Sequence, residues 1–272
     1  MHVTFDTNVI NPLACPDMYK KTCPDMASVN VIRESIRARQ IYAYMSEASM
    51  SLEAISNDER VDVFFRQWAS GTYPIQLPEP SDERKQVFSK AIQLGFRVLH
   101  VPRMGLKTFI WFPETVWAED TSFQLNRYGD YIYSQPDTGV TSIKKLGAEL
   151  VTIHGLSTAH LAHLVILPSW PTAEEIMWLD GLLAEYDSPM KFTSRTKFLE
   201  EFREKVAEWF DTDIQASHYA YGHDYLCTFD CASKAGPSSI MHRDRIAINS
   251  KRFGINIVSP NKLVEFVTQN ET

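Results

Sequence analysis

The first 55 residues alternate short β-prone runs with helical periods, and this order constrains the fold more than any other feature of the chain. The run at 3–5 is short and apolar, and the run at 41–45, "IYAYM", is β-branched and aromatic, so both predict strands. Between them, residues 28–40 carry apolar side chains at a helical period, and 46–55 predicts a further helix. Strands that are joined through a helix run parallel. The start of the chain therefore predicts a βαβ unit and an α/β fold with a mostly parallel sheet.

The rest of the chain adds elements of the same kinds. Further helices are predicted at 61–70, 82–95, 172–186 and 194–210, and further strands at 96–102, 108–112, 225–229 and 253–259. Asp211 or Thr212 is expected to cap a short helix that ends at Gly222, and Ser259 to cap a last helix with Pro260 at its first position. The prolines in 11–26 predict a loop or broken helical turns. Residues 231–252 predict a long polar and basic loop.

Composition excludes several classes of protein. A net charge of −7 argues against a protein held on nucleic acid by its overall charge, but it leaves room for a local basic strip. No run of 18 uncharged apolar residues occurs, and no basic segment followed by an apolar run stands at the N-terminus, so neither a membrane span nor a secretory signal is expected. The four cysteines follow no zinc or disulfide pattern and are expected to be free thiols in the cytoplasm: Cys15, Cys23, Cys227 and Cys231.

Four carboxylates are predicted to meet at one edge of the sheet. Asp6 and Asp230 each follow a predicted strand directly, and the carboxyl ends of parallel strands lie at the same edge. Glu53 lies early in the helix after the second strand, and helical side chains lean toward the start of their helix, hence toward that edge. Asp213 lies in the first turn of the helix that precedes the Asp230 strand. Each acid alone is best explained as a turn or solvated helix residue, but four together are hard to ascribe to chance.

Such a cluster favours a divalent cation. Close carboxylates repel one another, and a hard cation with oxygen ligands, Mg²⁺ or Mn²⁺, relieves that repulsion. Hydroxyl and amide groups that can hold the carboxylates in place are present at Thr7, Asn8 and Thr228. If the cluster is built for metal, Asp6→Asn is expected to raise the melting temperature of the metal-free protein, because one charge leaves the cluster. Asp211 and Asp224 lie near Asp213 in the sequence, and either of them is an alternative to Asp213 as the third carboxylate of the cluster.

Four segments of the chain, taken in order, resemble the PIN-domain nucleases. "VTFDTNVI" is similar to their opening strand with its Asp-Thr-Asn, and "MSEASMSLEAI" to their second segment, a strand running into a helix that carries a Glu. "DIQASHYAYGHDYLCTFD" resembles their third and fourth segments, an Asp that opens an Ala-containing helix and a strand that ends in Thr-x-Asp. "FGINIVSPNKLVEFV" is similar to their closing strand, proline and helix. The resemblance covers 1–57 and 196–272, which is 134 of the 272 residues.

The resemblance implies a three-layer α/β/α sandwich with a central, mostly parallel sheet, enlarged by an inserted mixed α/β region. The PIN-like core would consist of an N-terminal part at 1–57 and a C-terminal part at 196–272. The insertion at 58–195 would contain one further core strand, 96–102. The chain departs from the family after the fourth acid, because 22 residues, 231–252, precede the final strand where the family usually has few.

Carried over to this sequence, the family's acidic site falls on Asp6, Glu53, Asp213 and Asp230, with Asn8 and Thr228 at supporting positions. The resemblance implies an endoribonuclease that uses Mg²⁺ or Mn²⁺ to hydrolyse phosphodiester bonds, leaving a 3′-hydroxyl and a 5′-phosphate. The alternative is a catalytically inactive PIN-like scaffold that binds RNA or a protein partner. The expected partners are an RNA substrate, an antitoxin-like or other protein and a second copy of the chain, but no membrane. Toxins of bacterial toxin–antitoxin pairs share this core, although they are usually about half this length.

Other candidate sites are weaker. The predicted loop at 231–252 has a net charge of +4, and its Lys234, Arg243 and Arg245 are candidate contacts to a phosphate backbone, with a solvated loop as the plain alternative. A phosphatase of the haloacid dehalogenase type also starts with a strand and an Asp, but it needs Asp-x-Asp, and this chain has Asn8 at the third position. His160 and His163 lie one helical turn apart, but they lack the further ligands that zinc needs.

Overall fold

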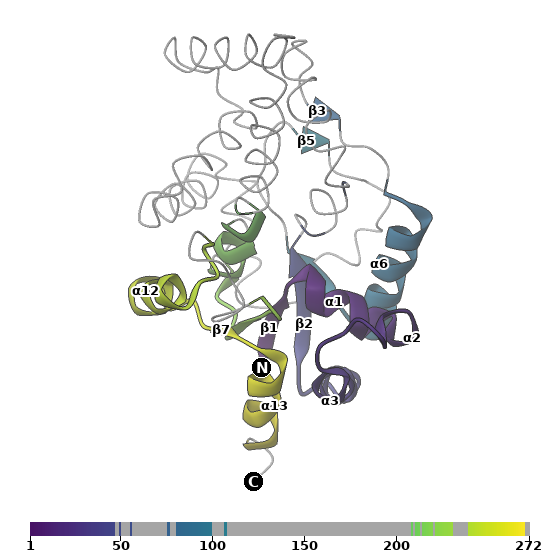
Figure 1. The fold of residues 1–272 in the computed structure, drawn as a ribbon, viewed down its shortest axis with the longest axis horizontal. Coiled ribbons are helices and arrows are strands. Elements are labelled where there is room, and N and C mark those ends of the chain that lie inside the picture. Colours follow the sequence, from purple (N-terminus) through teal and green to yellow (C-terminus); the bar gives the residue numbers. More distant parts are fainter. Residues whose placement is uncertain are drawn as a thin grey trace.

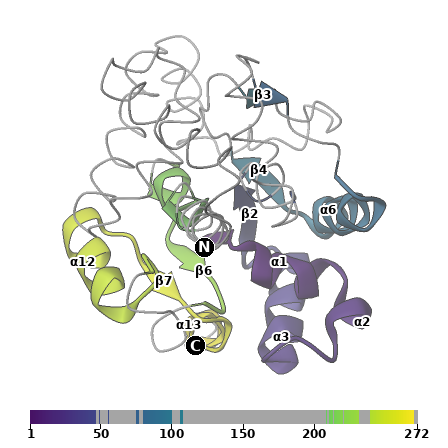
Figure 2. The same ribbon diagram turned by 45° about the horizontal axis from the view of Figure 1, so that its top comes forward.

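In the part of the chain that the structure describes, five short parallel strands make the central sheet. The computed structural model of the chain describes residues 1–46, 49, 55, 75–76, 80–99, 106–107, 208, 210–212, 214–219, 221–230 and 239–269. The strands of the sheet are β1 (His2–Phe5), β2 (Tyr42–Ser46), β4 (Arg97–Leu99), β6 (Tyr225–Cys227) and β7 (Ile257–Val258). They lie in the order β4-β2-β1-β6-β7 and all pair in parallel (Figures 1 and 2). A separate parallel pair joins β3 (Ile75–Gln76) to β5 (Leu106–Lys107). The expected α/β class with a mostly parallel sheet is confirmed.

The order of the strands creates a switch point between β1 and β6. From β1 the chain moves outward through β2 to β4, and it later returns to the other side of β1 with β6 and β7. Phe5 lies opposite Cys227, and the next backbone N–H, that of Asp6, donates to the Cys227 carbonyl at 3.0 Å. Open α/β sheets bind ligands beyond the carboxyl ends of their strands at such a switch point. A site is therefore expected where β1 and β6 end.

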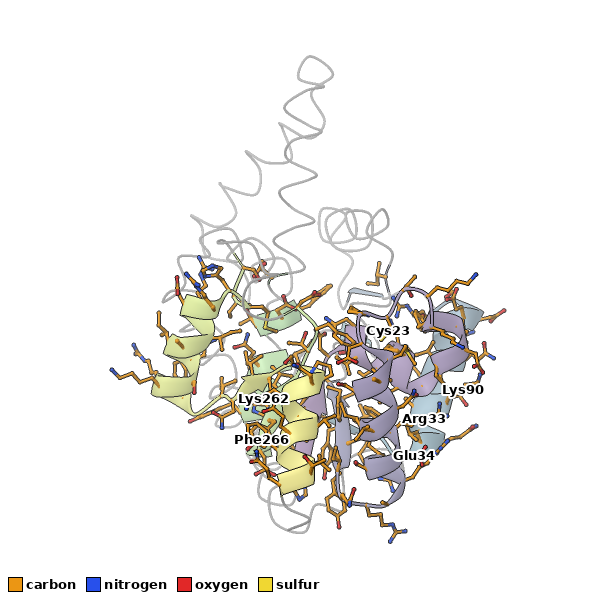
Figure 3. The ribbon with its side chains drawn as sticks, turned by 60° about the horizontal axis from the view of Figure 1, so that its bottom comes forward. Cys23, Arg33, Glu34, Lys90, Lys262 and Phe266 are labelled. Carbon is orange, nitrogen blue, oxygen red and sulfur yellow. The ribbon has the colours of Figure 1, made fainter. Side chains whose placement is uncertain are left out.

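One face of the sheet carries the hydrophobic core. Side chains alternate along a strand, so Val3 and Phe5 of β1 share a face with Ala43 and Met45 of β2, and all four are buried. Buried side chains of four helices complete this core on the same face (Figure 3). The helices are α1 (Thr7–Ala14), α3 (Met26–Arg37), α6 (Asp82–Leu94) and α13 (Pro260–Gln269), and the short α2 (Pro16–Tyr19) links α1 to α3. Each large aliphatic or aromatic side chain buried here contributes about 1.5–3 kcal/mol to folding.

The helices of this layer begin at capping residues that the sequence supplies. Asp25 accepts a hydrogen bond from Ser28 N at 3.0 Å at the start of α3, and Ser81 accepts one from Arg84 N at 3.3 Å at the start of α6. Asp6 plays the same part for α1, where its side chain accepts from Thr7 N. Gly95 ends α6 with a φ of 116°, a left-handed backbone conformation that residues other than glycine rarely adopt. The chain turns there into β4.

The opposite face of the sheet is polar near its centre. Thr4 of β1 and Tyr44 of β2 lie opposite each other and are buried. The Thr4 hydroxyl is 2.8 Å from Nδ1 of His223 and 3.2 Å from Nδ1 of His218. His218 belongs to the helical residues 214–219, so this segment contacts the face of the sheet that α1 and α3 leave open.

Most predicted elements in the described part are confirmed. The strands predicted at 3–5, 41–45, 225–229 and 253–259 correspond to β1, β2, β6 and β7, and the helices predicted at 28–40 and 82–95 to α3 and α6. The strand predicted at 96–102 corresponds to β4, which pairs with β2 at the edge of the main sheet. The last helix begins at Pro260, and Leu263 N donates to the Ser259 carbonyl at 3.0 Å, which confirms Ser259 as the residue before its first turn.

Two predictions about the C-terminal part are wrong. Residues 231–252 are not a loop throughout, because α12 occupies Arg243–Phe253 and ends at Gly254, whose φ is 70°. Asn249 is the one residue of this helix that is fully buried, so it lacks the apolar stripe by which a helix is recognised in a sequence. Asp211 and Thr212 do not cap a helix, because both are themselves helical, and Thr212 Oγ1 donates to the Glu208 carbonyl at 2.9 Å as a residue inside a helix does.

Several predictions concern parts of the chain outside the described residues. These are the helices at 61–70 and 172–186, most of the helices at 46–55 and 194–210, the strand at 108–112, and His160 and His163. Cys15, Cys23 and Cys227 are free thiols as expected, and Cys231 lies outside the described residues. Within the described ranges, no helix has the length and apolar character that crossing a membrane requires.

Candidate functional site

Asp6 lies at the carboxyl edge of the sheet, between the end of β1 and the start of α1. Its Oδ1 accepts a hydrogen bond from Thr7 N at 2.7 Å, which caps the helix. Its Oδ2 accepts from Thr228 Oγ1 at 2.6 Å and from Asn8 Nδ2 at 2.8 Å. The side chain is only 5% exposed. Asp6 is therefore both a helix cap and a member of a cluster that includes residues from the far end of the chain.

Asn8 joins the two predicted acids that the structure describes. Its Nδ2 donates to Asp6 Oδ2 at 2.8 Å and to Asp230 Oδ2 at 3.0 Å. Its Oδ1 accepts from the backbone N–H of Phe229 at 3.1 Å. Because both carboxylate distances end at one nitrogen atom, the two oxygens can be no further apart than the two distances together. The amide thus holds the ends of β1 and β6 against each other across the switch point.

Thr228 forms hydrogen bonds with both aspartates, with the carboxylate of Asp6 and with the backbone N–H of Asp230. Its side chain is fully buried, and its hydroxyl donates to Asp6 Oδ2. The oxygen of this hydroxyl also accepts from Asp230 N at 3.0 Å and lies 3.0 Å from Asn8 Nδ2, whose two hydrogens are shared among three acceptors. A hydroxyl has one hydrogen to donate and two lone pairs to accept with, so this one is fully used. Thr228 and Asn8 occupy the supporting positions that the sequence predicts for them.

The two carboxylates differ in how much water they meet. Asp6 is buried among donors, whereas Asp230 is exposed at the surface beyond β6. Within the described part of the chain, Asp230 Oδ2 has Asn8 as its partner, and Oδ1 has none. An exposed carboxylate beside a buried, firmly held one offers oxygen atoms to a ligand that arrives from solvent.

Two predicted basic residues lie at the same edge. α12 connects β6 to β7, which are parallel neighbours, so it runs from the carboxyl edge back to the amino edge. Arg243 and Arg245 stand in its first turn, and they are therefore on the Asp230 side of the sheet, whereas Lys251 and Arg252 are in its last turn on the far side. The Arg243 side chain is 74% exposed. The topology of this connection thus assigns the start of α12 to the side of the sheet on which Asp6 and Asp230 lie.

Three predicted site residues lie outside the described part of the chain: Glu53, Asp213 and Lys234. Among the described residues, no group of three or more histidine, cysteine, aspartate or glutamate side chains is arranged to hold a metal ion. Asp6 and Asp230 alone are two carboxylates. They fit Mg²⁺ or Mn²⁺ in the chemistry of their donors, since both ions prefer oxygen ligands, and in their hydrogen-bonded juxtaposition through Asn8.

A buried histidine cluster is a feature that the sequence analysis missed. His2, Tyr44 and His223 lie together, with the Tyr44 and His223 ring centroids 4.1 Å apart and His2 Nδ1 at 2.9 Å from the Tyr44 hydroxyl. Burial lowers the pKa of His218 to about 4. Burial, followed by His218 and His2, lowers the pKa of His223 well below its usual range. Both imidazoles are therefore neutral at pH 7, and each contacts the single hydroxyl of Thr4.

A signal for this cluster is present in β1. His2 and Thr4 alternate there with the apolar Val3 and Phe5, which indicates a strand with one polar face. The partners His218 and His223 stand more than 200 residues away, at separations of 214 and 219 positions from Thr4. Only the parallel pairing of β1 with β6 brings them to that face.

Comparison with known proteins found no relative of this chain. No family model matches the chain, and no curated protein or solved structure matches it either. The chemistry of the site therefore follows from its own residues.

Proposed function

We propose that this protein is a metal-dependent endoribonuclease with a PIN-like core. The observation that carries the proposal is the amide of Asn8, which donates to both Asp6 and Asp230 at the switch point of a parallel sheet. A turn residue alone needs no such link to a second acid from the far end of the chain. The strand order and the helices on one face support a three-layer α/β/α arrangement, with the helical residues 214–219 contributing to the second helical layer.

In the proposed site, Asp6 and Asp230 hold Mg²⁺ or Mn²⁺ together with Glu53 and Asp213. When bound, the ion supplies a water of lowered pKa and neutralises charge on the phosphate. Asn8 and Thr228 act as positioning residues, since their hydrogen bonds fix both carboxylates before any ligand arrives. Asp6 is buried, so its orientation is set by the protein, while the exposed Asp230 meets the substrate side of the site.

The start of α12 is the proposed contact to the RNA backbone. Arg243 and Arg245 stand in the first turn of the helix that leads from β6 to β7, and this position supports the role. Guanidinium groups bind phosphate oxygens through paired hydrogen bonds and keep their charge at any physiological pH. Such contacts position a nucleic acid without reading its sequence. Lys234 is a third candidate for the same role.

The proposal is tested by comparing two aspartates at opposite ends of one strand. Asp230 follows β6 and Asp224 precedes it, and both are exposed. Asp230→Asn is expected to abolish Mn²⁺-dependent cleavage of single-stranded RNA, while the control Asp224→Asn keeps it, because its amide oxygen can still accept from His2 N. Circular dichroism checks that both variants fold. Cleavage by Asp230→Asn at the wild-type rate would remove Asp230 from the site and refute the proposal.

A thermal measurement separates the nuclease from the inactive scaffold. A site that binds Mn²⁺ only in the folded state stabilises the protein by about 2.7 kcal/mol at 100 times the dissociation constant. Wild type is expected to show this gain and Asp230→Asn clearly less. If Mn²⁺ leaves the melting temperature of the wild type unchanged and no RNA is cleaved, the chain is a PIN-like scaffold for RNA or a protein partner.

A further inference from the structure

A cavity lies within the helical layer, apart from the candidate nuclease site. Its volume is about 370 Å³, and it is bounded by the end of α1 and by α2, α3 and α6. α3 and α6 lead into β2 and β4, so their second halves lie toward the amino edge of the sheet. Asp6 and Asp230 stand at the carboxyl edge. The cavity is therefore a separate feature that the proposed nuclease activity does not use.

The lining of this cavity has a cationic side and an apolar side. Arg33 and Arg37 stand one helical turn apart on α3, and Lys90 faces them from α6. One carboxylate, Asp17 of α2, also lines the cavity, so the charged side chains around it sum to a positive value in a chain of net charge −7. The other residues of the lining are mostly apolar, with Gln93 as the exception: Ala14, Cys15, Pro16, Met18, Gln93 and Leu94.

Among the described residues, two of the three cations have no carboxylate to pair with. Arg37 Nη1 lies 2.6 Å from Glu34 Oε1, but Arg33 and Lys90 form no ion pair with any described residue. Arg33 Nε is buried and has no hydrogen-bond acceptor within the described part of the chain. A buried guanidinium nitrogen without an acceptor is costly, because it has lost water and gained no partner in exchange.

Arg33 and Lys90 converge on one place between the helices. Figure 3 labels Arg33 on α3 and Lys90 on α6; both residues line the cavity, and the two helices are in contact. Both cations are close enough to Cys15, at the end of α1, to act on its thiol. Burial, the larger effect, raises the pKa of Cys15, while Lys90 and Arg33 work in the opposite direction. The positive charges of the two side chains therefore act on Cys15, which is itself one of the residues that line the cavity.

We propose that this cavity binds a small phosphorylated molecule, with its phosphate monoester held by Arg33, Lys90 and Arg37. The guanidinium fork matches the geometry of phosphate oxygens, and an ammonium beside it adds a point charge. The volume of about 370 Å³ lies within the range of small-molecule sites and exceeds what a phosphate group alone fills. The apolar lining accommodates the organic part of the ligand.

Calorimetric titration in EDTA at constant ionic strength tests this site. The probes are inorganic phosphate, ribose 5-phosphate, a 5′-mononucleotide and the corresponding nucleoside. The phosphorylated probes are expected to bind and the nucleoside is not. Equal affinity for all three phosphorylated probes would identify free phosphate as the ligand, and tighter binding of one monoester would identify its organic part. Failure of every phosphorylated probe to bind would overturn the proposal.

Variants assign the binding to this cavity. Arg33→Gln is expected to weaken binding of the tightest probe about tenfold or more and also to raise the melting temperature without ligand, because an unpaired cation is removed. Lys90→Gln, at an exposed position of α6, is expected to weaken binding as well. The control is Lys85→Gln on the same helix, whose side chain lies 3.8 Å from Asp82 and outside the cavity lining.

The outcome is independent of the nuclease proposal. Asp230→Asn and Arg243→Gln are expected to bind the phosphorylated probes as wild type does, since neither residue lines the cavity. If those two variants lose binding, the phosphate occupies the candidate nuclease site and the cavity proposal is refuted. If Arg33→Gln lowers the melting temperature and keeps full affinity, Arg33 has a purely structural role and the proposal fails in that case too.

Discussion

Asp6 shows how the hydrogen bonds around one residue change an expectation drawn from charge. The sequence indicates an acidic cluster with unrelieved repulsion, which predicts that Asp6→Asn stabilises the metal-free protein. The structure instead surrounds the Asp6 carboxylate with three donors, from Thr7, Asn8 and Thr228. A carboxylate has two oxygens to accept with, whereas the amide of Asn has one. The balance at this residue therefore favours the charged side chain even without metal.

The first prediction reverses the expectation from the sequence. Asp6→Asn should keep the cap of α1, because Asn caps as well as Asp. The second carboxylate oxygen becomes an NH2 group, however, which cannot accept the hydrogen bonds from Thr228 and Asn8. The expected loss in unfolding free energy in EDTA is about 1–3 kcal/mol, measured by urea denaturation. The control is Asp25→Asn at the cap of α3, where the side chain accepts from Ser28 N and joins no second acid, and a smaller loss is expected. A stabilised Asp6→Asn would show that repulsion dominates after all.

The second prediction concerns Thr228, whose hydroxyl is the only part of the side chain that valine cannot imitate. Thr228→Val should cost about 1–3 kcal/mol of unfolding free energy, because Asp230 N loses its acceptor and Asp6 loses a donor. Thr228→Ser keeps the hydroxyl and should restore most of that loss. Thr268→Val on the exposed surface of α13 is the matched control and should stay within about 0.5 kcal/mol of wild type. Equal losses in Thr228→Val and Thr228→Ser would assign the effect to packing alone.

At the level of single elements, α12 decides where the basic residues of 231–252 lie. If 231–252 were a loop, all of its basic residues would be equal candidates for contact with a substrate. In a helix that returns from β6 to β7, the charges of the first turn are separated from those of the last turn by the length of the helix. His242 occupies the capping position at its start, and Gly254 ends it. The two ends therefore make different predictions.

The third prediction compares these two ends. Arg243→Gln and Arg245→Gln should each weaken RNA binding and reduce its salt dependence by about one unit of logarithmic slope for each phosphate contact that is lost. Lys251→Gln, in the last turn of the same helix, should leave the slope unchanged. Fluorescence anisotropy with labelled single-stranded RNA over a range of salt concentrations provides the measurement. A uniform effect of all three substitutions would indicate general attraction by charge rather than contact at the start of α12.

For the molecule as a whole, the histidine cluster predicts sensitivity to acid. A buried histidine with a lowered pKa stays neutral in the folded protein, whereas the unfolded chain takes up a proton near pH 6.5. The unfolding free energy therefore falls as the pH drops from 6.5 toward 4, and the loss is complete below the folded pKa. For His218, whose pKa is about 4, the loss amounts to about 3 kcal/mol. His223 acts in the same direction.

The fourth prediction follows from this window. Urea denaturation of the wild type at several pH values should show stability declining between pH 6.5 and 4. His223→Asn should decline less steeply, because Asn can occupy the place of Nδ1 beside Thr4 without taking up a proton, and Nε2 has no partner among the described residues. The variant is expected to be less stable than wild type at pH 7. The comparison therefore concerns how steeply the unfolding free energy changes with pH, and not the unfolding free energy at any one pH. An equally steep decline would assign the acid sensitivity to other groups.

What the sequence determined about this protein is mainly local. The periods of apolar residues predict β1, α3, β2, α6 and β4, because each pattern is contained within one element. The position of Asp6 and Asp230 after strands predicts a shared edge, since parallel strands all end on the same side. The helix α12 escaped prediction because a polar helix leaves no apolar stripe in the sequence.

The tertiary structure alone decided which side chains meet. Asn8 reaches Asp230 across 222 positions of sequence, and Thr4 reaches His218 across 214. The same is true of the cationic cavity, where Arg33 and Lys90 come from different helices. Hydrogen bonds and ion pairs act over a few ångströms. Whether two distant side chains come that close depends on how strands and helices pack, and a local pattern of residues does not contain that information.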